Sequence, residues 1–200
     1  MRPYLLLASV LALPAMAADN AYVQQGGKLG QDQGLAFSFF AGYTGGGDSF
    51  VVDNYSGGSE KVRFGSRYHL GLGAQWEKDS FGAAFNVGYQ FNNDGDLNLK
   101  RYTLELLPFY QMGRHKFSVG PSWHFDVKSD IKLDGNHEKF KFKDALGAIV
   151  QYDYQLDQHN WVGVRYQWVE YELDKYNGVS MPGGTKGDGN QWGFYYRSVF

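Results

Sequence analysis

The amino-acid sequence predicts an all-β fold: a closed, eight-stranded antiparallel up-and-down barrel that crosses a membrane. Three observations lead to this prediction. Bulky apolar residues alternate with small or polar ones in eight stretches, which is the period of a strand with one apolar face. The stretches run about 10–15 residues, longer than the usual strand of a soluble sheet, whereas a tilted strand needs roughly 9–11 residues to cross a bilayer. Short and long connections also alternate, as they do in transmembrane barrels.

The front of the chain has the pattern of a secretory signal peptide. Arg2 is the only charged residue among the first eighteen. The apolar run 4–13 is too short to span a bilayer as a helix, and the small-residue cleavage site A-M-A follows at 15–17. We therefore expect three parts: a cleaved signal peptide at 1–17, a short periplasmic N-terminal segment at 18–33 and the transmembrane barrel domain at 34–200.

Composition narrows the function classes. The chain has no Cys, so it has no disulfide, thiolate metal site or lipidated cysteine. Its 19 Lys and Arg against 21 Asp and Glu do not suggest a nucleic-acid partner. After the signal peptide, no stretch approaches the 18 consecutive apolar residues of a spanning helix, so any crossing of a membrane falls to strands.

The eight strands are expected where the apolar stripes lie. The stripes cover residues 35–43, 62–76, 81–91, 102–112, 117–127, 140–154, 162–168 and 192–200. Short turns are expected at 77–80, 113–115 and 155–160, and longer loops at 44–61, 92–98, 128–139 and 173–189. Alternation alone also suits a soluble sandwich. The face opposite the bulky one is rich in Gly, Ala and Ser, however, and this suits the narrow lumen of an eight-stranded barrel.

Closure of the barrel follows from the lipid environment. An unpaired backbone N–H or C=O in hydrocarbon costs several kcal/mol, so the last strand must pair with the first, 34–43. Pro108 and Pro121 lie inside two predicted strands, and a local bulge is expected there. Two aromatic girdles are expected. They are Tyr43, Tyr68, Tyr89, Tyr102 and Phe125 on the loop side, and Trp76, Phe81, Tyr110, Phe117, Tyr152, Tyr154, Trp161 and Phe200 on the turn side.

These features resemble a known family. The A-x-A signal, the eight alternating strands and the ending W-x-F-x-Y-x-x-x-F are similar to small Gram-negative outer-membrane proteins such as OmpX, the OmpA membrane domain and the opacity-type barrels. The resemblance implies a monomer in the outer membrane, with a porin-like fold. It also implies that the barrel-assembly machinery recognises Phe194, Tyr196 and Phe200, although Ser198 is polar where an apolar residue is more usual.

The inward positions carry charge, and two interpretations are open. The predicted lumen residues are Arg63, Arg67, Arg101, Glu105, Asp126, Asp153, Arg165 and Arg197. They could form a polar network that fills the lumen and satisfies its own charges, because paired buried charges are tolerable. They could instead gate a narrow pore.

No catalytic or metal site is expected. Ser122, His124 and Asp126 follow one another at alternate positions, but strand neighbours two apart are about 6.6–7 Å apart, too far for a direct hydrogen bond. The histidines lack metal-ligand spacing, and the Asp- and Gly-rich loops do not match a calcium loop. No cofactor is expected.

Surface chemistry gives the last expectation. Lys139, Lys141 and Lys143 cluster where a long loop meets the membrane, so they either contact lipopolysaccharide phosphates or serve general solubility. The predicted function is a structural or surface-interaction role: membrane integrity, adhesion or ligand contact through the loops. The alternatives are a narrow or OmpW-like pore for small or hydrophobic solutes, and a lipid A-modifying barrel enzyme.

Overall fold

The computed structural model describes residues 34–53, 59–63, 67–94, 97–133 and 136–200, and the predicted signal peptide and periplasmic segment lie outside these ranges. Among the described residues the only helices or strands are β-strands. They are β1 (Gly34–Gly46), β2 (Ser49–Asp53), β3 (Ser59–Arg63), β4 (Tyr68–Lys78), β5 (Phe81–Asp94), β6 (Leu97–Met112), β7 (His115–Leu133), β8 (Asn136–Phe142), β9 (Ala145–Gln155), β10 (Asn160–Trp168), β11 (Glu170–Tyr176), β12 (Val179–Ser180), β13 (Lys186–Asp188) and β14 (Gln191–Val199). These ranges contain no helix that is long and apolar enough to cross a membrane.

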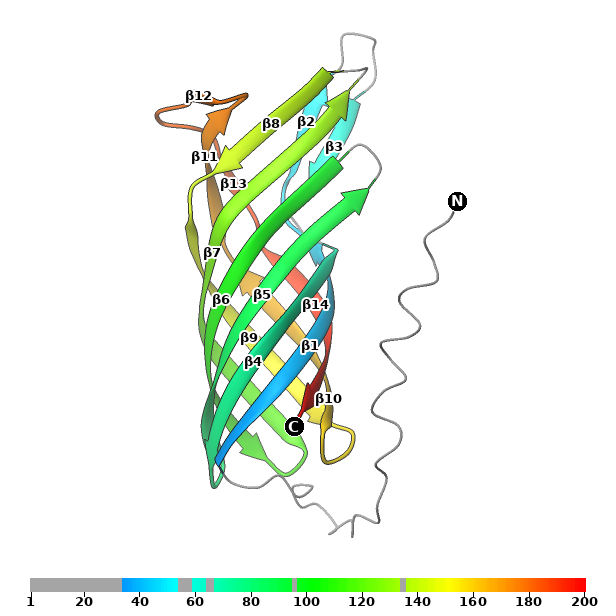
Figure 1. The fold of residues 1–200 in the computed structure, drawn as a ribbon, viewed down its shortest axis with the longest axis vertical. Coiled ribbons are helices and arrows are strands. Elements are labelled where there is room, and N and C mark those ends of the chain that lie inside the picture. The colour runs from blue at the N-terminus through cyan, green and yellow to red at the C-terminus, as the bar shows by residue number, and fades with distance from the viewer. Residues whose placement is uncertain (1–33, 54–58, 64–66, 95–96, 134–135) are drawn as a thin grey trace.

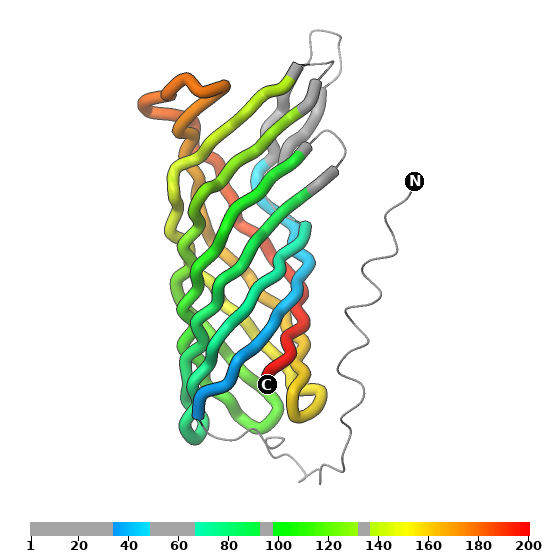
Figure 2. Tube along the Cα trace, viewed as in Figure 1, coloured from blue at the N-terminus to red at the C-terminus, as the bar shows by residue number. Residues whose placement is uncertain are grey.

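Eight of these strands close into a barrel. Antiparallel pairing runs β1-β4-β5-β6-β7-β9-β10-β14 and returns from β14 to β1. The first and last strands lie side by side in Figures 1 and 2, and their register runs from Ser38 opposite Val199 to Gly46 opposite Gln191. The backbones of Phe37 and Phe200 exchange two hydrogen bonds of 2.9 Å. The predicted closure of an eight-stranded barrel is confirmed.

The wall of the barrel continues beyond the closed ring at the long-loop end. There β7 pairs with β8 instead of β9, and β8 pairs in turn with β11. Strand β11 also pairs with β13, which leads into β14. The three tight turns lie at the opposite, short-turn end, where the C-terminus also lies (Figure 1). The molecule is therefore a tube with one short rim and one extended rim.

The second predicted strand is shorter than expected. The sequence predicted one strand over 62–76, but the barrel strand β4 begins at Tyr68, and Ser59–Arg63 pairs with β2 in a separate hairpin. The Arg67 carbonyl still accepts a hydrogen bond from the Thr44 N–H (2.9 Å), so the chain runs beside β1 up to that point. The apolar alternation continued across both segments, and it could not show that they pair with different partners.

The two prolines do not create the expected bulge. Pro108 and Pro121 both face outward on β6 and β7. The same register holds on both sides of them, with Glu105 opposite Ser122 and Phe109 opposite Ser118. Proline removes a backbone donor without changing the residue count, so pairing lapses locally and then resumes in step. Expecting a bulge here was wrong.

The bulge in this strand pair lies at Asp126 on β7. The register between β6 and β7 shifts by one between Lys100 and Tyr102. Asp126 has a φ of 52°, in the left-handed region that Asp tolerates better than most residues. Beyond it Val127 is fully buried, although its stripe predicted it on the outer face. One extra residue therefore reverses which side chains of β7 face outward.

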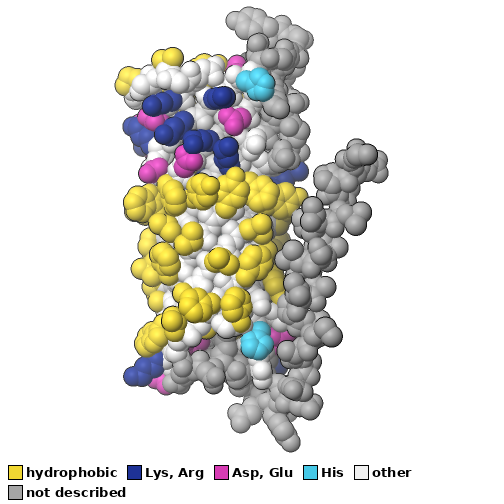
Figure 3. Space-filling view, in the orientation of Figure 1, with side chains coloured by type: hydrophobic (Ala, Val, Ile, Leu, Met, Phe, Trp, Pro, Cys, Tyr) yellow, Lys and Arg dark blue, Asp and Glu magenta, His cyan; other side chains and the backbone are white. Residues whose placement is uncertain are grey.

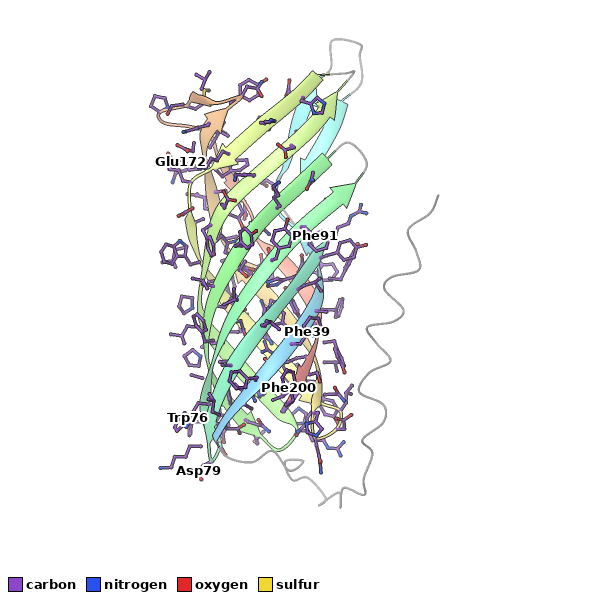
Figure 4. All side chains as sticks on the ribbon, viewed as in Figure 1. Phe39, Trp76, Asp79, Phe91, Glu172 and Phe200 are labelled. Atoms are coloured by element: carbon purple, nitrogen blue, oxygen red, sulfur yellow. The ribbon has the colours of Figure 1, made fainter. Side chains whose placement is uncertain are left out.

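The outer surface of the closed barrel is apolar. Leu72, Val119 and Leu146 are 63–74% exposed, and Figure 3 shows a broad hydrophobic zone below a charged one. A chain of ring contacts of 5.1–5.8 Å forms its upper edge, which we call the upper aromatic belt. Its members are Tyr43, Tyr68, Phe91, Tyr89, Tyr102 and Phe125. Toward the short-turn end Trp76 and Phe200 point away from the barrel (Figure 4).

Candidate functional site

The candidate site is the polar interior of the barrel. Five of the predicted lumen residues are at most 6% exposed: Arg101, Glu105, Asp153, Arg165 and Arg197. They come from β6, β9, β10 and β14, and each occupies the face opposite the apolar stripe of its strand. The alternation that directs bulky groups outward therefore brings these charges together inside the tube.

An ion pair lies at the centre of this interior. Arg165 Nη1 and Glu105 Oε1 are 2.7 Å apart, and both side chains are buried. The other carboxylate oxygen of Glu105 accepts a hydrogen bond from Asn86 (3.0 Å), while Arg165 donates two more to Gln151. The guanidinium also lies 4.1 Å from the ring centre of Tyr195. Charge pairing and hydrogen bonding together satisfy groups that would be costly to bury alone.

Toward the short-turn end the network continues through Arg197. Its Nη1 donates to Ser38 Oγ (2.9 Å) and to Asn86 Oδ1 (3.0 Å), so it reaches β1 and β5 from β14. Gln151 donates to both carboxylate oxygens of Asp153 at 2.7 Å. These contacts extend the network across to β9.

Toward the long-loop end a second layer surrounds Arg101. This side chain donates to Gln90 (2.6 Å) and Gln191 (3.0 Å), and its guanidinium lies 5.2 Å from the ring centre of Tyr171. Gln191 donates to Gln167 (2.9 Å). The layer therefore connects β5, β6, β10 and β14.

His69 links the two layers. Its Nδ1 is 2.8 Å from Tyr195 Oη and 3.2 Å from the Gln90 amide, and its Nε2 is 3.1 Å from Thr103 Oγ1. The ring is packed against glycine, since a Cβ at Gly88 would lie 2.2 Å from His69 Nε2. The small residues on the inner face thus provide the space that the large lumen side chains occupy.

The other three predicted lumen residues are not seen in the lumen. Two lie on the surface, and the side chain of the third lies outside the described residues. Arg67 is exposed, because the inward alternation of β4 begins only at His69. Asp126 lies on the outer surface at the bulge, where it pairs with Lys128 Nζ at 2.6 Å. Arg63 belongs to the β2–β3 hairpin, and its side chain lies outside the described residues.

Other lumen residues were missed. Lys116 is buried at the short-turn end, with its Nζ 4.0 Å from the Trp161 ring centre, 4.6 Å from that of Phe109 and 3.4 Å from Gln75 Oε1. Trp161 was predicted in the outer girdle, but it is fully buried opposite Arg197. The signal was available: Trp161 is one residue out of phase with the outward stripe at 162–168.

The prediction that Ser122 and His124 are too far apart for a direct hydrogen bond was wrong. Ser122 Oγ lies 3.0 Å from His124 Nε2, and His124 Nδ1 lies 2.6 Å from Tyr171 Oη. Both side chains lean along the strand, so the spacing of their backbones does not keep them apart. Gln167 also contacts the His124 ring, and Asp126 is not part of the cluster. Ser122, His124 and Tyr171 have no exposed surface.

No metal cluster is found in the described part of the chain, where no group of three or more His, Cys, Asp or Glu could hold an ion. Most of the described interior polar groups are engaged with one another, as the preceding contacts show. Four buried atoms in the described ranges have no hydrogen-bond partner: Asn92 Oδ1, Gln111 Oε1, Ser129 Oγ and Trp161 Nε1. What this arrangement supports is hydrogen bonding between strands across the tube.

The predicted assembly residues lie on β14. Phe194 and Phe200 are 58% and 70% exposed on the outer face, and Tyr196 is half-buried and donates to Asn160 Oδ1 (2.5 Å). The Val199 N–H donates to the His159 carbonyl (2.7 Å), so the last strand is tied to the turn before β10. The terminal aromatic residues are thus presented on an ordered strand.

The three predicted lipopolysaccharide lysines differ in their surroundings. Lys139, Lys141 and Lys143 are all exposed, but Lys143 pairs with Glu172 at 2.6 Å. The hydrogen bond and charge of Lys143 lower the pKa of Glu172. Lys141 lies instead in register with lysines of neighbouring strands, which we call the lysine row. The row consists of Lys100, Lys128, Lys141 and Lys175.

The solved structures that are similar to the chain include two outer-membrane or surface proteins. Neisserial surface protein A (NspA) is 14% identical with a TM-score of 0.46, and the match covers 84% of this chain and 98% of that protein. The outer membrane protein OprG from Pseudomonas aeruginosa is 15% identical with a TM-score of 0.47, and the match covers 88% of this chain and 98% of that protein. No protein-family model matches the chain, and no curated protein sequence matches it significantly.

Proposed function

We propose that the chain is a Gram-negative outer-membrane protein with a sealed, non-catalytic barrel. Its work is structural or lies in surface interaction: membrane integrity, adhesion or ligand contact at the long-loop end. The observation that carries this proposal is the hydrogen-bonded network across the lumen, centred on the buried pair of Glu105 and Arg165. An eight-stranded interior is only just filled by its side chains. A hydrogen-bonded network that crosses such an interior favours a sealed barrel.

The outer surface supports the membrane location. Exposed leucine, valine and phenylalanine cover the closed barrel, and the upper aromatic belt borders them. A soluble protein rarely exposes so large a continuous apolar zone, whereas lipid tails require one. Closure through β1 and β14 leaves this zone without a strand edge, which favours a monomer.

The route to the membrane is also part of the proposal. The predicted signal peptide at 1–17 would direct export, and Phe194, Tyr196 and Phe200 would be read by the barrel-assembly machinery. The exposure of Phe194 and Phe200 on the final strand supports this role. Outer-membrane lipid and lipopolysaccharide would then surround the apolar zone.

Conductance tests the sealed barrel. The purified protein is inserted into planar bilayers, with protease protection in vesicles as the independent check of insertion. We expect silent bilayers. A variant with Arg101, Glu105 and Arg165 all changed to Ala serves as the matched control, because it removes the centre of the network and should conduct if it folds. Discrete conductance steps from the unaltered protein would favour the pore instead.

A further inference from the structure

We propose that the lysine row binds the phosphate groups of lipopolysaccharide in the outer leaflet. The proposal rests on the membrane location proposed above and names the lipid that the long-loop rim contacts. It assigns the contact to Lys100, Lys128, Lys141 and Lys175, which the sequence separates by up to 75 positions and the sheet brings together.

The row is a product of strand register. Lys100 on β6 pairs with Lys128 on β7, Lys128 pairs with Lys141 on β8, and Lys141 pairs with Lys175 on β11. Directly opposite residues in an antiparallel pair have Cβ atoms about 4.5–5.5 Å apart. Four ammonium groups therefore cross four adjacent strands in a line, and all of them are exposed or half-exposed on the outer face.

Such a row is unfavourable by itself. Like charges directly opposite each other destabilise a sheet. Among the described residues, Lys128 has an ion-pair partner in Asp126, at 2.6 Å, while no ion pair is found for Lys100, Lys141 or Lys175. By contrast, Lys143 and Lys186 nearby each pair with a glutamate at 2.6 Å. An external anion would relieve the repulsion among these three aligned cations.

The height of the row identifies that anion. Lys100 is two residues from Tyr102 on the same face of β6, and Tyr102 belongs to the upper aromatic belt. Figure 3 shows a band of basic side chains, with acidic ones among them, directly above the hydrophobic zone. Aromatic belts mark the level of the lipid headgroups, so the row lies where headgroup phosphates are found.

The interior changes character at the same level. Below it the lumen holds Arg101 and its hydrogen-bonded partners. Above it a hydrophobic core forms inside the tube from Val127, Phe142, Ala145, Val169 and Tyr171. A wall with apolar side chains on its inner face and charged side chains on its outer face is typical of a protein surrounded by water. The lysine row therefore lies at the boundary between lipid and water on these strands.

Binding to lipopolysaccharide micelles tests the proposal. The full-length folded protein is compared with K100Q/K141Q/K175Q, which removes the unpaired lysines, and with K78Q/K143Q/K186Q, which removes the same charge elsewhere. At about fivefold per lysine near an anionic lipid surface, we expect the first triple variant to bind roughly a hundredfold more weakly. The second should bind like the unaltered protein. Equal losses in both variants would overturn the lysine row in favour of general charge attraction.

Two further arms identify the ligand. Dephosphorylated lipopolysaccharide should bind to the unaltered protein as weakly as intact lipopolysaccharide binds to the first triple variant. If millimolar inorganic phosphate competes, the site takes free phosphate and the lipid assignment is wrong. The K100R/K141R/K175R variant should retain binding, because arginine keeps the charge.

Insertion is measured separately, by protease protection in phospholipid vesicles. A protein that does not insert would contradict the proposed function itself. A protein that inserts, but whose K100Q/K141Q/K175Q variant binds lipopolysaccharide normally, would overturn this inference alone.

Discussion

Glu105 has no contact with solvent, and its carboxylate is held by Arg165 and Asn86. Replacing Glu105 with an uncharged residue would leave the Arg165 guanidinium buried beside Gln151 and Tyr195 without its ion-pair partner. The pair is therefore a place where one side chain controls the stability of the whole lumen.

We expect Glu105→Gln to lower the free energy of unfolding by about 3 kcal/mol, because it leaves an uncompensated buried cation. Urea unfolding in detergent micelles would measure it. Asp126→Asn is the matched control: it also removes a carboxylate from an ion pair, but the pair is half-exposed, and we expect a loss below about 1 kcal/mol. Similar losses in the two variants would show that the interior is wetter than its burial implies.

The left-handed backbone at Asp126 gives a second residue-level prediction. A β-branched residue fits poorly at a φ of 52°, so Asp126→Val should cost about 1–2 kcal/mol. Asp126→Asn should cost less, since Asn tolerates this conformation. The same urea titration compares the two, and a smaller loss for Val than for Asn would rule out strain as the cause.

Among the elements, the turn between β9 and β10 fixes the position of the last strand. The Asp157 carboxylate accepts hydrogen bonds from the backbone N–H groups of His159 and Asn160 (both 2.9 Å) and from the Asn160 amide. Asn160 in turn accepts the Tyr196 hydroxyl. Partial burial would raise the pKa of Asp157, but these hydrogen bonds to its charged form outweigh it and lower the pKa.

This lowered pKa predicts an acid dependence. The stability that Asp157 contributes is fully present above the pKa of an unfolded Asp and is lost as the pH falls through the lower folded pKa, below about 4. We expect Asp157→Ala to cost about 1 kcal/mol at pH 7 and to unfold with a flatter dependence below pH 4. Thermal unfolding across pH 2–7 would measure this. Parallel curves for the two proteins would contradict it.

The strands and their faces could be predicted from the sequence, whereas the bulge and the cross-strand register could not. Alternation predicted the strands, the closure and the inward position of Arg101, Glu105 and Arg165, because a period of two assigns every residue on a strand to a face. It could not predict the bulge at Asp126, since an extra residue leaves the sequence pattern unchanged. The lysine row was missed for a related reason: cross-strand register depends on turns and bulges that alternation does not specify.

At the scale of the whole molecule, the faces of the tube exchange their character along its length. In the closed barrel most bulky apolar groups face outward, and in the extended rim they face inward. The closed barrel also holds a buried apolar cluster, formed by Ala84, Leu107, Phe109 and Ile149. On some strands the apolar residues move from even-numbered to odd-numbered positions, which face the opposite side. On β6, for example, Leu106 is exposed in the closed barrel, whereas Leu99 is buried in the extended rim. On β7 the apolar positions stay odd-numbered throughout, from Phe117 to Ile131, and the bulge turns them inward.

Tryptophan fluorescence tests this assignment of faces. Trp123 is 52% exposed on the outer face, whereas Trp161 is fully buried in the lumen. In vesicles of brominated lipid, a variant that keeps only Trp123 should lose most of its emission, and one that keeps only Trp161 should lose little. The remaining tryptophans are changed to Phe in each. Strong quenching of Trp161 would show that the lumen is open to lipid or that the faces are misassigned.

The bulge at Asp126 makes β7 sensitive to length rather than to composition. Deleting Asp126 would leave the other residues of the strand unchanged. Lys128 and Asp130 would nevertheless face the interior of the tube, and Val127 and Ile131 would face water. Many substitutions here would leave the two faces of β7 in place, but an insertion or deletion of one residue would exchange them beyond the bulge.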